Sequence, residues 1–196
     1  MTRYVLPILL SACGLASQKA PVCEAVPLGI DNLFSGSERR DIIKAISNWE
    51  AASGNRICFQ ILWRDTANDK RSFKSDNRFT IYSQRRPWQV RSATTVGKSS
   101  CPRKSSCLGL TVWNDGGRAS DIFVLAAKPP ILRATIEHEL GHMFGLGHSQ
   151  TYESIMYPTI NKDKQIGVTD RRILGCLLET RTFLRSRNRC SEQVKP

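Results

Sequence analysis

The chain has 196 residues, a length that suits a single domain with a sizeable buried core. Its composition is that of an ordinary globular protein, and no stretch approaches the ~20 consecutive apolar residues of a membrane-spanning helix, which excludes such a span. The formal net charge of +12 indicates a basic surface that would attract acidic partners.

Residues 1–12 have the pattern of a signal peptide. Arg3 supplies a basic start, Tyr4–Leu10 a short apolar core, and the following small residues a cleavage site. Leu10-Ser11-Ala12-Cys13 resembles a bacterial lipobox, in which the cysteine is lipidated and becomes the mature N-terminus. We therefore expect an exported lipoprotein, anchored to a membrane through Cys13, at the outer membrane or cell surface of a bacterium. The alternative is a plain secretory signal, with a periplasmic or extracellular protein in which Cys13 is an incidental thiol.

Cysteine usage agrees with export. Removing Cys13 from the seven cysteines leaves six, enough for three disulfides in an oxidising compartment: Cys23, Cys58, Cys101, Cys107, Cys176 and Cys190. Fifteen pairings are possible, and the sequence does not decide among them. Cys101–Cys107 and Cys176–Cys190 would close short loops and leave Cys23 to pair with Cys58. No Cys-x-x-Cys occurs, which argues against cysteine ligands for zinc.

Residues 13–36 are expected to form a linker, because proline and glycine interrupt them and they show little periodicity. A helix is predicted to begin at Ser37, whose side chain can cap it, and to end near Gly54. Its apolar residues recur at helical spacing, at Ile42, Ile43, Ile46 and Trp49. Arg56–Trp63 then alternates as a strand does, and Arg78–Tyr82 is a second strand-like stretch.

Residues 64–104 carry eleven lysines and arginines against three aspartates. Aromatic residues are interleaved with these charges, a combination that would suit the binding of single-stranded nucleic acid. Solvated charge on a long loop is the interpretation that we favour, so we do not expect nucleic acid as a partner.

Two strands and a helix follow. Cys107–Trp113 and Ser120–Ala126 alternate as strands, and Asn114–Gly117 between them predicts the turn of a hairpin. Pro129 and Pro130 suit the first turn of a helix. Its apolar face is predicted to pack on the sheet, opposite the face that carries two histidines: Leu132, Ile136, Leu140 and Met143.

This helix carries the sequence His138-Glu139-Leu140-Gly141-His142-Met143-Phe144-Gly145-Leu146-Gly147-His148, which fits H-E-x-x-H-x-x-G-x-x-H. His138 and His142 lie four residues apart, so they share a helix face and can hold one zinc ion between them. Gly145 allows the left-handed turn that ends the helix and brings His148 round as the third ligand. The chain has three histidines, and all of them lie in this motif.

Three protein ligands leave one zinc position open, which is typical of a catalytic rather than a structural zinc site. Glu139 is not spaced to join the ligands, but its carboxylate can reach a zinc-activated water and act as general base. Amide hydrolysis is the reaction that this arrangement suits. Unrelated histidines on an ordinary amphipathic helix are the alternative, which five fixed positions in eleven argue against.

Met156 lies eight residues past His148, within Ser154-Ile155-Met156-Tyr157-Pro158. With this segment the chain resembles the metzincin metallopeptidases, whose Met-turn underlies the zinc. Ser149 after the third histidine and the short gap to the methionine are similar to the matrixin branch, which contains the matrix metalloproteinases and their bacterial relatives. Beyond the methionine, Asn161–Gly167 is a polar loop, and Thr169 with Asp170 is predicted to cap a last helix that reaches about Phe183.

The resemblance implies an α+β metzincin, zincin-like domain over residues 37–190, followed by a tail at 191–196. Its parts would be a twisted mixed sheet, a zinc-binding active-site helix, the Met-turn and a C-terminal helix. The first hairpin strand would be the antiparallel edge strand that pairs with an extended substrate. Pro158 and Ile160 would line the substrate pocket, with Ile160 where many matrix metalloproteinases have tyrosine.

The function predicted is that of a secreted zinc-dependent endopeptidase with one catalytic Zn²⁺, whose partners are protein or peptide substrates and, through the lipid anchor, a membrane. The alternative is a catalytically inactive, zinc-bearing binding module of the cell envelope. An intact Glu139 speaks against that alternative, because a binder has no use for the carboxylate. The sequence leaves calcium sites and oligomeric state undetermined.

Overall fold

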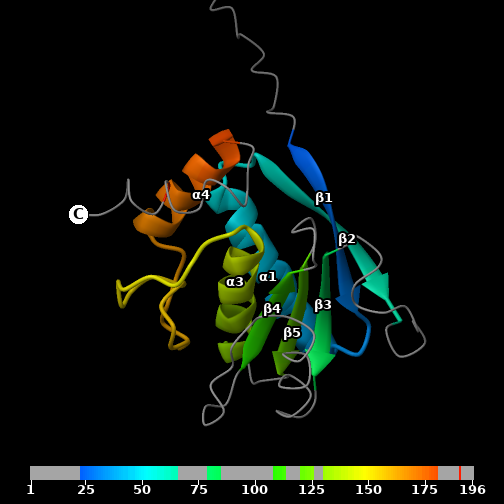
Figure 1. The fold of residues 1–196 in the computed structure, drawn as a ribbon. Helices are drawn as coiled ribbons and strands as arrows, with labels where there is room; N and C mark the ends of the chain where they lie inside the picture. The colour runs from blue at the N-terminus through cyan, green and yellow to red at the C-terminus, as the bar shows by residue number, and fades with distance from the viewer. Residues whose placement is uncertain are drawn as a thin grey trace, which may run out of the picture.

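The structure is a computed structural model that describes residues 23–65, 79–84, 108–113, 120–125, 130–180 and 190. These residues form five strands and three helices (Figure 1). In chain order the elements are β1 (Glu24–Asp31), α1 (Gly36–Ala52), β2 (Ile57–Arg64), β3 (Phe79–Gln84), β4 (Gly109–Trp113), β5 (Ser120–Leu125), α3 (Ile131–Met143) and α4 (Val168–Thr180).

The strands form one mixed sheet in the order β2-β1-β3-β5-β4. β1 pairs parallel with β2 and β3, β3 pairs parallel with β5, and β4 runs antiparallel to β5. The α+β class and the mixed sheet expected from the sequence are confirmed, and β4 is the antiparallel edge strand. The turn predicted at Asn114–Gly117 lies outside the described residues.

The linker predicted over residues 13–36 is wrong for residues 24–31, which form β1 in the interior of the sheet. Leu28 and Ile30 of this strand are fully buried. Gly29 interrupts the apolar pattern for a steric reason, because a Cβ there would lie 2.6 Å from Arg64 Cδ and 2.9 Å from Thr80 Oγ1. Side chains of both neighbouring strands therefore cross over Gly29. The glycine weakens the strand pattern in the sequence, but the packing of the sheet requires it.

The N-cap of helix α1 lies two residues earlier than predicted. Ser35, rather than Ser37, is the N-cap, and it forms a capping box with Glu38. The Ser35 N–H donates to Glu38 Oε2 at 2.6 Å, while the Glu38 N–H donates to Ser35 Oγ at 3.4 Å. Two main-chain donors that a helix start leaves unpaired are thereby satisfied.

The core lies between the sheet and helices α1 and α3, which pack against each other on one side of it (Figure 1). Its fully buried residues include, from the strands, Leu28, Ile30, Ile81, Ile122 and Val124, and, from the two helices, Ile42, Trp49, Leu132, Ile136 and Leu140. The four apolar residues predicted to face the core from α3 are all buried. The histidine-bearing side of α3 is not simply exposed, since His138 is only 4% accessible.

Among the described residues, two disulfides are formed, Cys23–Cys58 and Cys176–Cys190. The first joins the residue before β1 to β2, and the second joins α4 to the buried Cys190, 14 residues further along the chain. Cys176–Cys190 is one of the two short-loop pairs considered from the sequence, and Cys23–Cys58 is the pair that those two would leave. Cys101, Cys107 and the predicted lipidation site Cys13 lie outside the described residues, and so does most of the basic segment 64–104. Among the helices that the structure describes, none is long and apolar enough to cross a membrane.

Candidate metal centre

The three histidines of the motif come together at one end of α3. Their ligand nitrogens all lie within 4.8 Å of one another. The ring centroids of His138 and His142 are 4.6 Å apart, and the ring of His148 lies 5.3 Å from the first and 4.9 Å from the second. Three imidazoles at this spacing can bind a single metal ion.

Gly145 makes the turn that the sequence predicted. Helix α3 ends at Met143, Phe144 is its C-cap, and Gly145 has φ +90°. The Gly145 N–H donates to His142 O at 2.8 Å, and the Leu146 N–H donates to Gly141 O at 3.0 Å. These bonds satisfy carbonyls at the helix end, and the reversal carries the chain back toward His148.

Main-chain carbonyls orient two of the imidazoles. His138 Nδ1 lies 2.7 Å from Ile155 O, and His142 Nδ1 lies 2.9 Å from Leu146 O. A carbonyl can only accept, so Nδ1 carries the hydrogen in both rings and Nε2 keeps its lone pair for a metal. Burial also lowers the pKa of His138 to about 4, which keeps this ring neutral. Neutral nitrogen donors fixed in this way fit a zinc ion.

Glu139 stands apart from the histidine cluster, as its position on the helix predicted. It is 4% exposed and turns toward β4, where Thr111 Oγ1 donates to Glu139 Oε2 at 2.6 Å. Burial raises the pKa of Glu139 to about 7, and the hydrogen bonds from Thr111 oppose that rise. A carboxyl group with a pKa near neutrality suits both uptake and release of a proton.

Met156 packs directly beneath α3. A Cβ on Gly141 would collide with Met156 Sδ and would lie 3.1 Å from Trp49 Cζ2. Gly141, which lies between the two histidines of the helix, therefore allows the side chains of Met156 and Trp49 to approach the helix backbone. The Ser149 N–H donates to Met156 O at 2.8 Å, which joins the segment after His148 to the methionine turn.

A buried carboxylate holds this turn from below. Ser154 Oγ donates to Asp170 Oδ1 at 2.7 Å and accepts from the Met156 N–H at 2.9 Å. The other Asp170 oxygen accepts from the Gly167 N–H at 2.8 Å. The sequence indicated Asp170 only as a helix cap, whereas the structure shows that it also anchors the turn. Burial raises the pKa of this carboxyl group above its ordinary value.

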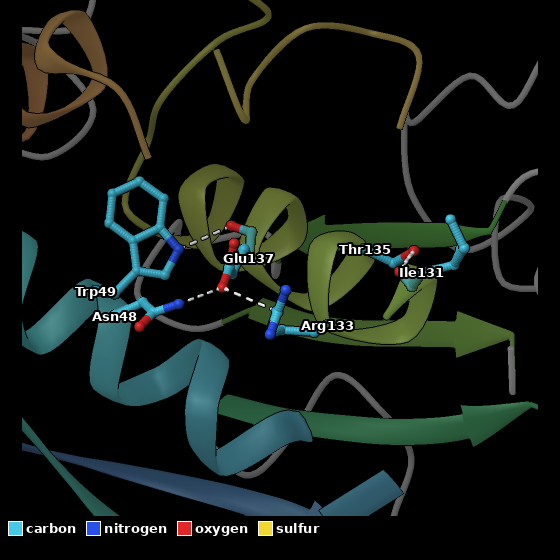
Figure 2. A network of polar contacts seen from close by, with 6 residues as sticks. All are labelled: Asn48, Trp49, Ile131, Arg133, Thr135 and Glu137. Carbon is cyan, nitrogen blue, oxygen red and sulfur yellow. Dashed lines mark hydrogen bonds and ion pairs between the residues drawn. The ribbon is translucent and has the colours of Figure 1, made fainter. Parts of the chain in front are cut away.

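A second polar network fixes α3 against α1 (Figure 2). Trp49 Nε1 donates to Glu137 O at 2.8 Å, and Asn48 Nδ2 donates to Glu137 Oε1 at 2.6 Å. Arg133 Nε lies 4.0 Å from the same carboxylate oxygen. From the sequence, Trp49 was identified only as part of an apolar helix face, and Asn48, Arg133 and Glu137 were not identified. The signal that could have found them is an acidic residue, Glu137, directly before the first histidine in an otherwise apolar stretch.

The loop beyond the methionine turn has a lysine at its centre. Lys164 is only 4% exposed, and its ammonium group lies 4.1 Å from the ring centroid of Tyr152 and 3.9 Å from that of Tyr157. Its Nζ also donates to Tyr152 O. Of the predicted pocket residues, Pro158 is exposed and Ile160 is half-buried against the core, so their role in substrate binding stays a prediction.

Comparison with known proteins identifies a family for the chain. The family model of matrixin, a peptidase family, matches residues 32–175. Metalloendoproteinase 2-MMP of Arabidopsis thaliana is 47% identical over 45 residues, which cover 23% of this chain and 12% of the plant protein. The match thus spans a small part of that relative. The crystal structure of archaemetzincin from Methanopyrus kandleri superposes with a TM-score of 0.49 at 12% identity, covering 80% of this chain and 96% of that one.

Proposed function

The chain belongs to the matrixin family, and from that membership we propose that it is a zinc-dependent endopeptidase that hydrolyses peptide bonds in proteins. The observation that carries the proposal is the meeting of three histidines whose ligand nitrogens lie within 4.8 Å of one another. Glu139 follows the first of them on the same helix and is not part of the cluster. In this assignment His138, His142 and His148 hold the metal and Glu139 is the general base.

Each residue has a defined part in the proposed reaction. A zinc ion at the three histidines would supply a Lewis acid, which polarises a peptide carbonyl and acidifies water. Glu139 takes the proton from the attacking water and passes it to the leaving amine nitrogen. The carbonyls of Ile155 and Leu146 hold two of the rings in the tautomer that metal binding needs.

Digestion of a peptide library by the purified protein tests this function. We expect cleavage within peptides that a zinc chelator abolishes and that added zinc restores. The alternative, an inactive zinc-bearing binding module, predicts that the protein binds zinc and cleaves nothing. Cleavage that continues undiminished under chelation would contradict a zinc mechanism.

The same digest tests the proposed substrate pocket. By resemblance to matrixins, Pro158 and Ile160 line the site that receives the side chain just after the scissile bond. We expect Leu, Ile, Met or Phe there, because burying such a side chain contributes roughly 1.5–3 kcal/mol, whereas a charged one would be desolvated without a partner. Cleavage mainly before Asp, Glu, Lys or Arg would remove the pocket assignment and leave the zinc chemistry standing.

We place this activity outside the cytoplasm, in a lipoprotein attached through Cys13. The lipobox-like Leu10–Cys13 supports the attachment, and two disulfides support an oxidising compartment. An extracellular or periplasmic protein with an ordinary signal peptide is the alternative.

A further inference from the structure

We infer that Thr111 and Gly109 of strand β4 are positioning residues that together set the place of the Glu139 carboxylate. The inference rests on the proposed function, in which Glu139 is the base, and adds that its orientation is controlled by the edge strand of the sheet. Gly109 supplies the space for the carboxylate, and the Thr111 hydroxyl supplies the side-chain hydrogen bond.

The two residues face Glu139 because they alternate along the strand. Positions i and i+2 of a strand point to the same side, so Gly109 and Thr111 both face α3, which packs on β4. Thr111 Oγ1 lies 2.6 Å from Glu139 Oε2 and 3.0 Å from the main-chain oxygen of the same residue. One hydroxyl thus contacts both the side chain and the backbone of Glu139, which ties the carboxylate to the strand.

Gly109 forms the other wall of this site. A Cβ at position 109 would lie 2.6 Å from Glu139 Oε1, 2.7 Å from Glu139 Cγ and 2.8 Å from Thr135 Cγ2. Thr135 and Glu139 lie four residues apart on α3, so they share the helix face that meets β4. Any side chain at position 109 must therefore displace the carboxylate or separate the strand from the helix.

Strand β4 is also the antiparallel edge strand, next to β5 on one side (Figure 1). By the resemblance to the matrixins, an extended substrate would pair with the other side of this strand. Strand β4 would then position both the substrate backbone and the Glu139 carboxylate, which fixes the two relative to each other. Orientation of this kind affects the chemical step more than substrate binding.

Replacement of Thr111 by valine keeps the shape of the side chain and removes the hydroxyl. We expect Thr111→Val to lower kcat about 10- to 100-fold, part of the ~10²–10⁴-fold contribution of a general base. KM and zinc affinity should change by less than about threefold, because the histidines and the strand edge are untouched. Thr111→Ser restores the hydroxyl and should recover kcat to within about threefold of the unaltered protein.

Gly109→Ala tests the space. The atoms in its way belong mostly to a flexible side chain, so we expect the protein to fold and the carboxylate to move, with a fall in kcat similar to that of Thr111→Val. Gly36→Ala is the matched control, since a Cβ there meets nothing within 4 Å, and it should leave kcat unchanged.

Crystal structures of the metal-free variants supply a readout that does not need activity. In Thr111→Val and Gly109→Ala the Glu139 carboxylate should leave the position that it has against β4, and in Thr111→Ser it should keep it. An unmoved carboxylate, or a Thr111→Val protein with unaltered kcat, would overturn the inference. If the unaltered protein cleaves no peptide, the proposed function fails instead, and the structures still decide whether β4 places the carboxylate.

Discussion

Glu139 and the histidines lie within one short motif, yet the proposed reaction uses them differently. Glu139→Gln should leave zinc bound, because the side chain is not part of the histidine cluster. It should lower kcat by about 10²–10⁴-fold, because an amide cannot take the proton. Steady-state kinetics on a cleaved library peptide measures this, with the exposed Glu153→Gln as control. Near-full activity of Glu139→Gln would show that another group is the base.

The sequence predicted the residues of this site that are close together along the chain. Helical periodicity alone places His138 and His142 on one face, and Gly145 with φ +90° is the turn that His148 requires. Thr111 could not be predicted in the same way, because it meets Glu139 across 28 residues of chain. Its contact depends on how β4 packs on α3, which no local pattern encodes.

The buried carboxylate of Asp170 joins the methionine turn to α4. Asp170 accepts hydrogen bonds from Ser154 Oγ and from the Gly167 N–H. In Asp170→Asn the amide oxygen can still accept from the Gly167 N–H, but the NH₂ group then faces Ser154 Oγ, whose hydrogen loses its acceptor. We expect a loss of about 1–3 kcal/mol in the free energy of unfolding, the cost of leaving a buried polar group unpaired.

Urea denaturation of the Asp170→Asn protein measures this loss. Asp163 is exposed, so Asp163→Asn should change the free energy of unfolding by no more than about 0.5 kcal/mol. Zinc binding should also weaken in Asp170→Asn, because the turn that Asp170 anchors presents Ile155 O to His138. Equal stability of the two variants would mean that the turn is held by other contacts.

Elements with a clear period were predicted, and β1 was not. The pairing of β4 with β5, the strand β2 and helix α3 follow from alternation or helical spacing of apolar residues. In β1, Pro27 and Gly29 interrupt the apolar residues, and both are typical of loops. Pairing with β3 begins only at Leu28, past the proline, and Gly29 makes room for Arg64 and Thr80. Tertiary packing thus explains residues that local propensity assigns to a linker.

On the scale of the whole molecule, the lipid anchor proposed at Cys13 would fix where the protein acts. Cys13→Ser should abolish lipid attachment and either release the protein or leave it stranded as an unprocessed precursor, because acylation is what holds the mature protein to a membrane. Mass spectrometry of the mature protein measures the attachment directly. An unmodified Cys13 at the mature N-terminus, or a protein that retains residues 1–12, would contradict the lipoprotein proposal.

Zinc content tests the central claim, that three histidines form one metal centre, most directly. After dialysis, elemental analysis should find one zinc ion per chain in the unaltered protein and in Glu139→Gln. His148 is exposed, so His148→Ala should leave the core intact and yet lose most of the zinc. A zinc-free unaltered protein, or a His148→Ala protein that retains zinc as firmly, would contradict the account.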